Sequence, residues 1–166
     1  TGLDRRRLLQ MLAAAPAAGL AVGTAPARAA SVDTKAHIVI AGAGAAGLAA
    51  ASRLSTMLNG AKITLIDERK QHYYQPGFTL VAAGLKAPEY TISATKDYVG
   101  RGVELIEESV AEFDPAGNAV TTNKGRKVTY DFLIVATGLT LDYAAIEGMD
   151  TKLIGKDGIG SVYAGP

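Results

Sequence analysis

The sequence predicts an α/β fold that begins with a strand, a glycine-rich turn, a helix and a second strand. Residues 37–41 form a continuous apolar run of the kind that is buried on both faces of a parallel sheet. Residues 45–58 carry apolar side chains at helical spacing, and this pattern stops at Asn59-Gly60. Residues 62–67 have the pattern of a second strand. We therefore expect a Rossmann-like βαβ unit whose two strands are parallel.

The residues after this unit are predicted to leave the sheet, form a small antiparallel β-meander and then return. Residues 73–78 have the composition of a loop, and residues 93–99 have a weak helical pattern. The meander is expected to consist of residues 103–113, 119–123 and 127–130, with turn signals between them. The apolar run at residues 132–136 predicts a last, fully buried parallel strand that ends at Thr137-Gly138.

Three glycines between the first strand and the helix have the spacing of a dinucleotide-binding turn. Gly42, Gly44 and Gly47 form the pattern G-x-G-x-x-G. The first glycine permits a tight turn, the second lets the backbone approach a pyrophosphate, and the third lets the helix pack against the strand. The backbone N–H groups of Ala45 and Ala46 would then face the phosphates at the positive end of the helix dipole.

An acidic residue closes the second strand at the distance that this motif requires. Asp67 follows Gly47 by 20 residues, and its carboxylate would accept hydrogen bonds from the adenosine ribose. The same charge would repel a 2′-phosphate, which disfavours NADP. We interpret Glu68, Arg69 and Lys70, which follow Asp67, as a solvated charge run. These features predict a dinucleotide but do not by themselves distinguish FAD from NAD.

The distal run from Tyr130 to Gly138 separates the two cofactors. It is an apolar strand closing in Ala-Thr-Gly, and it resembles the second fingerprint of the two-dinucleotide flavoproteins. In that superfamily the first Rossmann unit holds FAD. The resemblance therefore predicts FAD as the cofactor and adds Thr137 and Gly138 to its site.

Three further segments resemble the sulfide:quinone oxidoreductase family, and the similarity extends from about residue 37 to residue 166. These segments are residues 72–84, 138–143 and 146–148. The resemblance places FAD contacts on Ala45 and Ala46, on Asp67, on Gln75 and on Val110. The family more often has Glu where this chain has Asp67, a change that shortens the side chain but keeps its charge. Residues 73–76 contain no cysteine, unlike the related flavocytochrome c sulfide dehydrogenase.

The resemblance implies that sulfide is oxidised with FAD and that membrane quinone receives the electrons. The chain has no cysteine, so no catalytic residue is assigned within it, and the family's catalytic cysteines are expected beyond Pro166. The remainder of the FAD fold and any membrane-associating region are expected there too, so that residues 30–166 are the N-terminal part of an incomplete FAD-binding domain. Two alternatives remain: another exported FAD oxidoreductase, such as a flavocytochrome c sulfide dehydrogenase subunit or an NADH:quinone oxidoreductase, and a non-catalytic dinucleotide-binding module.

Residues 1–29 have the organisation of a twin-arginine signal peptide. Arg5 and Arg6 precede an apolar run at residues 8–22, which is too short to span a bilayer. The run is followed by Ala27-Arg28-Ala29, a small-x-small cleavage pattern. Export by this route suits a protein that folds around its cofactor before it crosses the membrane. We therefore expect a periplasmic protein.

Composition excludes two classes of ligand for the mature chain. Residues 1–29 hold four arginines and one aspartate, and without them 13 basic and 15 acidic residues remain. This balance provides no basic surface for nucleic acid. The absence of cysteine excludes a thiolate metal site, and no other pattern predicts a metal.

Replacing both Arg5 and Arg6 with lysine is expected to keep the protein in the cytoplasm, because the paired arginines are the recognition element of this export route. Cell fractionation would measure the effect, and sequencing the exported wild-type protein should give Ala30 as its first residue. An undiminished periplasmic amount of the double variant would contradict the twin-arginine interpretation.

Overall fold

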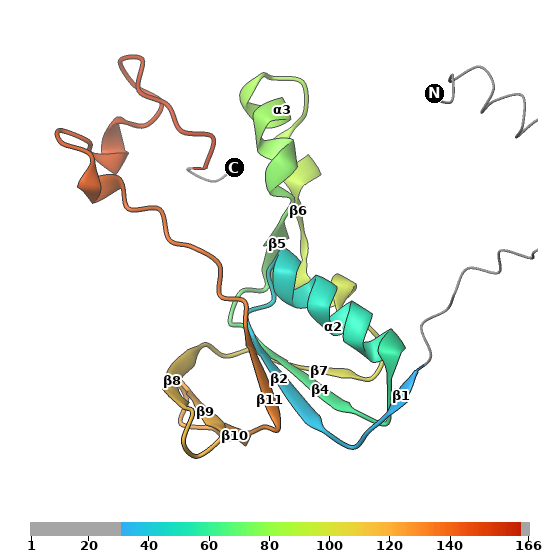
Figure 1. Cartoon of the computed structure of the whole chain (residues 1–166). Coiled ribbons are helices and arrows are strands. Elements are labelled where there is room, and N and C mark those ends of the chain that lie inside the picture. The colour runs from blue at the N-terminus through green and yellow to red at the C-terminus, as the bar shows by residue number, and fades with distance from the viewer. Residues whose placement is uncertain (1–30, 164–166) are drawn as a thin grey trace, which may run out of the picture.

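The centre of the structure is a four-stranded parallel sheet with the order β11-β2-β4-β7 (Figure 1). This computed structural model describes residues 31–163, so the predicted signal peptide at residues 1–29 lies outside the described residues. The sheet consists of β2 (His37–Ala41), β4 (Lys62–Ile66), β7 (Val103–Ile106) and β11 (Phe132–Val135). The first two strands pair in register from His37 opposite Lys62 to Ala41 opposite Ile66, which confirms the predicted βαβ unit.

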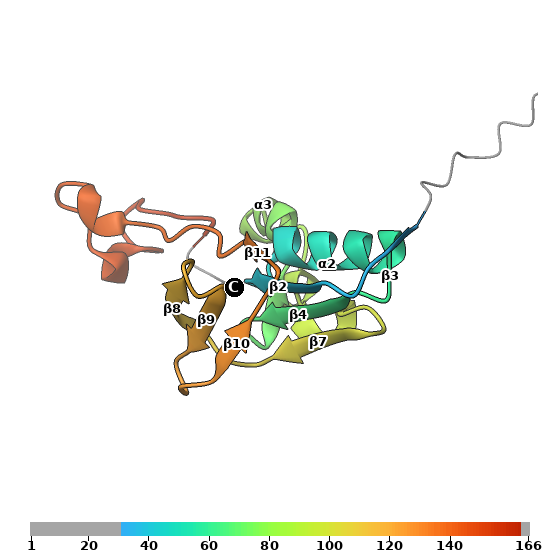
Figure 2. The same ribbon diagram turned by 60° about the horizontal axis from the view of Figure 1, so that its bottom comes forward.

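Helix α2 (Ala45–Met57) covers one face of this sheet (Figure 2). Alternate strand side chains point toward the helix, as expected for an extended backbone. The resulting helix-side core contains Ile38, Ile40, Ala43, Leu48, Ala51, Ile63 and Leu65. The helix ends where the sequence predicts, because Leu58 has an extended backbone and begins the two-residue strand β3 (Leu58–Asn59). This strand pairs in parallel with β1 (Val32–Asp33).

An antiparallel meander packs against the other face of the sheet. It consists of β8 (Val110–Asp114), β9 (Ala119–Thr122) and β10 (Lys127–Thr129), in the order β10-β9-β8. Val120 of the meander packs with the strand residues Val39, Ile66 and Ile106 to form the meander-side core. The fold therefore has three layers, and the sheet is the middle one.

Two predicted strands differ from the structure. Residues 103–113 were predicted as one segment of the meander, but β7 belongs to the parallel sheet, where Ile63 pairs with Val103, and only β8 belongs to the meander. The apolar run of β11 was predicted to be fully buried. Within the described residues it is an edge strand, and Phe132 and Val135 are 62% and 59% exposed. An apolar run indicates a strand but does not show on how many sides it is covered.

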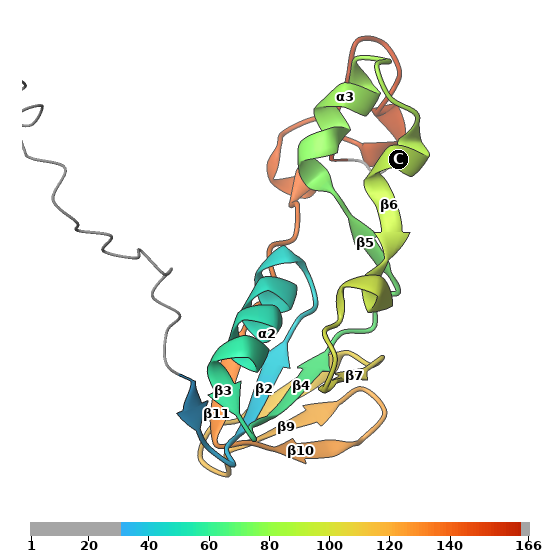
Figure 3. The ribbon, with the colours of Figure 1, turned by 90° about the vertical axis from the view of Figure 1, so that its right-hand side faces the viewer.

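An arm, residues 71–98, extends from the carboxyl end of β4 beyond the start of α2 (Figure 3). Its stem is an antiparallel pair of β5 (Gln71–Tyr73) and β6 (Ile92–Ala94), and its tip holds α3 (Phe78–Ala82). The loop predicted at residues 73–78 is in fact the end of β5 and the 3-10 turn η1 (Gln75–Gly77) that leads into α3. The helix predicted at residues 93–99 is also wrong, because these residues form β6 and the 3-10 turn η3 (Thr95–Tyr98).

The remaining described segments are short. One 3-10 turn, η2 (Pro88–Thr91), lies between α3 and β6, and η4 (Tyr143–Ala145) and η5 (Thr151–Leu153) lie after β11. The segment after β11 approaches the arm, where the rings of Phe78 and Tyr163 lie 6.2 Å apart. None of the helices within residues 31–163 has the length and apolar character needed to cross a membrane.

Gly47→Ala is expected to destabilise the fold by about 1–3 kcal/mol, because the added methyl group would overlap the carbonyl of Gly42 and force α2 away from the strand. Gly44→Ala is the matched control. The nearest atom to its new methyl group is Arg69 Nη2 at 3.8 Å, so a loss below about 1 kcal/mol is expected. Urea unfolding would measure both variants, and equal losses would show that the helix does not depend on the close approach at Gly47.

Candidate cofactor-binding site

The glycine turn crosses the edge of the sheet where the carboxyl ends of the strands meet. The Gly42 N–H donates a 2.8 Å hydrogen bond to the carbonyl of Ile66, at the end of β4. Ala136, at the end of β11, donates one of 2.8 Å to the carbonyl of Ala41. In open α/β sheets this edge is where ligands bind.

Gly42 and Gly47 are required by the protein itself. Gly42 has φ +105°, a conformation that favours glycine, and a side chain there would overlap the carbonyl of Ala136. A side chain at Gly47 would overlap the carbonyl of Gly42. These two glycines therefore bring the turn, the helix and β11 into contact.

Gly44 lacks any such structural reason to be glycine. Its φ is −74°, which other residues adopt, and the nearest atom to an added Cβ is Arg69 Nη2 at 3.8 Å. The space in front of Gly44 is thus open to a ligand. Gly44 also caps α2 without a side-chain hydrogen bond, so the N–H groups of the first helical turn, including those of the exposed Ala45 and Ala46, point out of the helix end.

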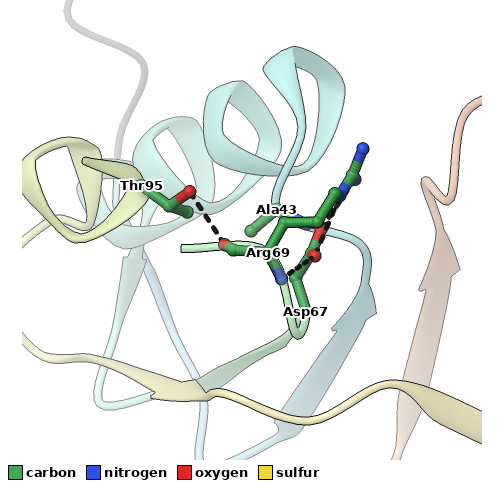
Figure 4. A network of polar contacts seen from close by, with 4 residues as sticks. All are labelled: Ala43, Asp67, Arg69 and Thr95. Carbon is green, nitrogen blue, oxygen red and sulfur yellow. Dashed lines mark hydrogen bonds and ion pairs between the residues drawn. The ribbon is translucent and has the colours of Figure 1, made fainter. Parts of the chain in front are cut away.

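Asp67 lies directly after β4 and faces the glycine turn (Figure 4). It is 7% exposed. Its Oδ2 accepts hydrogen bonds from the Ala43 N–H at 2.7 Å and from Arg69 Nη2 at 2.8 Å. Its Oδ1 accepts hydrogen bonds from the Arg69 backbone N–H at 2.8 Å and from Arg69 Nε at 3.0 Å. The carboxylate therefore ties the turn before α2 to the loop after β4.

These contacts keep Asp67 ionised. Burial alone would raise the pKa of this carboxyl group, but the hydrogen bonds from Arg69 and Ala43 and the charge of Arg69 hold the pKa below its ordinary value of 3.8. The hydrogen bond with Asp67 in turn raises the pKa of Arg69 above its ordinary value. The edge of the sheet thus carries one negative and one positive charge.

Part of the predicted site lines a pocket beside this turn. The pocket has a volume of about 240 Å³, and its walls include Gly42, Asp67, Val110 and Thr137, which come from four separate segments of the chain. Its other lining residues are Ile66, Glu68, Arg69, Ser109 and Phe113. The fold therefore brings together residues that the sequence places as much as 95 positions apart, from Gly42 to Thr137.

Phe113 and Arg69 belong to this pocket although the sequence analysis did not assign them to it. The pairing of β8 with β9 is irregular between Val110 and Glu112, and such a bulge changes the face to which the following side chains point. Val110 and Phe113 therefore both reach the pocket. Arg69 was predicted to belong to a solvated charge run; its side chain is more than half exposed, but it is also paired with Asp67, which that prediction missed. The position of a cation two residues after the strand-ending acid was the available signal.

Six of the ten predicted residues do not line the pocket: Gly44, Ala45, Ala46, Gly47, Gln75 and Gly138. The first four belong to the glycine turn and the start of α2 beside it. Gln75 is exposed in η1 on the arm, and Gly138, with φ +77°, follows Thr137 in an exposed segment. The arm and the segment after β11 extend beyond the carboxyl ends of the strands, on the side toward which α2 begins (Figure 3). The assignment of Gln75 and Gly138 to the cofactor stays a prediction.

The part of the chain that forms this site matches a known protein family. The chain matches the family described as pyridine nucleotide-disulphide oxidoreductase over residues 36–164, which include the glycine turn, Asp67 and every residue of the pocket. It belongs to this family. The pyridine nucleotide-disulphide oxidoreductases related to this chain are FAD-dependent flavoproteins, so FAD is the cofactor against which the site is tested.

Individual relatives confirm the resemblance to sulfide:quinone oxidoreductases. The chain is 38% identical over 128 residues to the mitochondrial sulfide:quinone oxidoreductase of Dictyostelium discoideum, a match that covers 76% of this chain and 28% of the relative. It is 35% identical over 115 residues to the sulfide-quinone reductase of Aquifex aeolicus, covering 69% and 26%. The crystal structure of the Aquifex aeolicus enzyme matches with a TM-score of 0.58 at 33% identity, covering 65% of this chain and 25% of that one. The chain thus spans about a quarter of the length of these relatives.

The residues present suit the ADP half of FAD. Gly44 leaves open space above the turn, outward-pointing N–H groups lie next to that space, and an ionised acid lies at the end of β4. Val110 and Phe113 supply an apolar wall on the same pocket. The open turn with its N–H groups suits an anionic pyrophosphate, the acid suits a ribose, and the apolar wall suits an adenine ring.

Asp67→Asn is expected to make the free energy of unfolding less dependent on pH in the acid range. The pKa of Asp67 is lower in the folded protein than in the unfolded chain, so its stabilisation is fully present above about pH 4 and is lost as the pH falls through the folded-state value. Hydrogen bonds to a charged group contribute about 1.5–3 kcal/mol, which is the loss expected for Asp67→Asn at pH 7. Urea unfolding between pH 3 and pH 7 would measure this.

The exposed Asp97 in η3 offers a matched control for that experiment. Asp97→Asn should reproduce the pH dependence of the wild-type protein. If Asp67→Asn also reproduced it, the carboxylate would not be the group that holds the turn.

Proposed function

We propose that the protein oxidises sulfide with FAD and passes the electrons to a membrane quinone, and that this chain holds the ADP half of the cofactor. The observation that carries the proposal is the pocket in which the glycine turn, Asp67, Val110 and Thr137 meet. The sulfide:quinone oxidoreductases among its relatives support the choice of substrates. Because the chain spans about a quarter of those relatives, the activity concerns the whole protein.

Each of the assigned residues has a proposed role toward FAD. Gly42, Gly44 and Gly47 shape the turn over which the pyrophosphate lies. The N–H groups of Ala45 and Ala46 donate to its oxygens at the positive end of α2.

The carboxylate of Asp67 accepts hydrogen bonds from the ribose hydroxyl groups, and Val110 packs beside the adenine. Thr137 lines the pocket after the end of β11, and Gly138 follows it. Gln75 on the arm is proposed to contact FAD, a role that rests on the family resemblance.

FAD, when bound, supplies the two-electron redox chemistry. The chain's own residues bind and orient the cofactor, and the three-layer fold fixes them on rigid strand ends. The chain contains no cysteine, so the thiols that accept sulfur in this proposal have to come from other residues of the protein. The same holds for the surface that meets membrane quinone.

We also propose that the protein works in the periplasm. This proposal is supported by Arg5 and Arg6 before the apolar run at residues 8–22, and by the small-x-small pattern that ends at Ala29. A folded flavoprotein is a suitable cargo for this export route. Membrane association would come from regions other than residues 31–163.

The full-length protein, purified with FAD, is expected to reduce a soluble quinone when sulfide is added, at about 1 per second or faster. Assays with sulfide and with NADH as alternative electron donors would distinguish this function from that of an NADH:quinone oxidoreductase. NADH-driven turnover without sulfide turnover would refute the choice of donor.

Gly44→Val is expected to fold but to lose FAD. Its side chain would occupy the open space above the turn, where it would meet the cofactor and would not overlap other parts of the protein. A yellow, stoichiometrically flavinylated Gly44→Val protein would refute the assignment of the turn.

A further inference from the structure

Arg69 fills the acceptor positions on Asp67 that a ribose would use. A carboxylate offers about four lone-pair positions. Here two N–H groups donate to each oxygen, and three of these four donors belong to Arg69. The two that come from its guanidinium group, Nε and Nη2, lie on the side of Asp67 that faces away from the strand (Figure 4). Ribose hydroxyl groups can therefore bind Asp67 only if the guanidinium group leaves.

The same guanidinium group lies next to the place where a pyrophosphate would approach the backbone. Arg69 Nη2 is 3.8 Å from the position of a Cβ on Gly44, and no other heavy atom outside residues 43–45 and the backbone of α2 lies within 4 Å of that position. Arg69 also lines the pocket together with Asp67 and Gly42. A phosphate oxygen above Gly44 would thus lie within reach of a bidentate arginine contact.

The backbone of Arg69 is held, whereas its side chain is free to change partners. The hydroxyl group of the buried Thr95 donates a 2.9 Å hydrogen bond to the carbonyl of Arg69 (Figure 4). The Thr95 N–H donates a second one of 2.9 Å to the carbonyl of Lys70. The side chain of Arg69, in contrast, is 57% exposed. Side-chain rotation can thus move the guanidinium group while the loop stays in place.

We propose that Arg69 is a cofactor-binding residue that gives up its ion pair with Asp67 and pairs with the pyrophosphate when the ADP half of the cofactor binds. Asp67 is thereby released to the ribose, and the positive charge moves to the phosphates. Pairing with Asp67 before binding keeps a buried carboxylate neutralised. The inference rests on the proposed function, because it assumes that the pocket takes an adenine dinucleotide.

The proposal predicts that removing Arg69 has opposite effects on ligands with and without phosphate. In the full-length protein freed of FAD, Arg69→Met should weaken the binding of ADP about tenfold at low salt, because a charge-assisted contact is lost. It should bind adenosine at least as tightly as the wild-type protein, because the competitor for Asp67 is gone. Calorimetric or fluorescence titration with each ligand at two salt concentrations would measure this, and the salt dependence of ADP binding should decrease in the variant.

Two variants serve as controls. Lys70→Met removes the same charge from the next residue, which pairs with Glu107 at 3.8 Å, and should leave both affinities within about twofold. Arg69→Lys keeps the positive charge but lacks the planar guanidinium group. It should therefore show the salt dependence of ADP binding that Arg69→Met loses.

Two results would overturn the exchange of partners: unchanged ADP binding in Arg69→Met, or an equal loss of ADP and adenosine, which is the effect of a merely structural residue. A different variant tests the proposed function itself. If Gly44→Val bound ADP as tightly as the wild-type protein does, the glycine turn would not be the phosphate site, and the role proposed for Arg69 would be refuted as well.

Discussion

The architecture depends on one close approach, in which the backbone of the glycine turn contacts the ends of two strands and the start of one helix. Gly42 donates to the end of β4, lies against the carbonyl of Ala136 after β11, and leaves its own carbonyl against Gly47 of α2. A side chain at either glycine would separate these elements. Because the contact is made by backbone atoms, it fixes the start of α2, the end of β11 and the position of Asp67 at the same time.

The parts of the fold predicted correctly are those determined by local sequence. The apolar run of β2, the helical spacing of α2 and the turn chemistry of the meander each depend on a few neighbouring residues. The glycine spacing and the distance to Asp67 likewise belong to one βαβ unit. Of the four predicted residues that line the pocket, Gly42 and Asp67 come from this unit, whereas Val110 and Thr137 come from the family resemblance.

The parts predicted wrongly depend on contacts between distant segments. Residues 103–113 are extended throughout, and only pairing with β4 shows that the first part, β7, belongs to the parallel sheet. The exposure of Phe132 depends on which strand lies next to β11. Arg69 belongs to a charged run in the sequence, and its role depends on how Asp67 is buried and on the open space at Gly44. These are properties of packing, which composition and periodicity do not contain.

The pocket is bounded by two different layers of the fold, and this has a consequence for how the protein responds to change. Gly42 and Asp67 belong to the sheet layer, whereas Val110 and Phe113 belong to the meander. The spacing between the layers is set by the meander-side core, in which Val120 packs against Val39 and Ile66. The width of the pocket is therefore a property of the hydrophobic interior. Temperature, pressure or a substitution that loosens this interior would therefore act on the width of the pocket as well as on the stability of the chain.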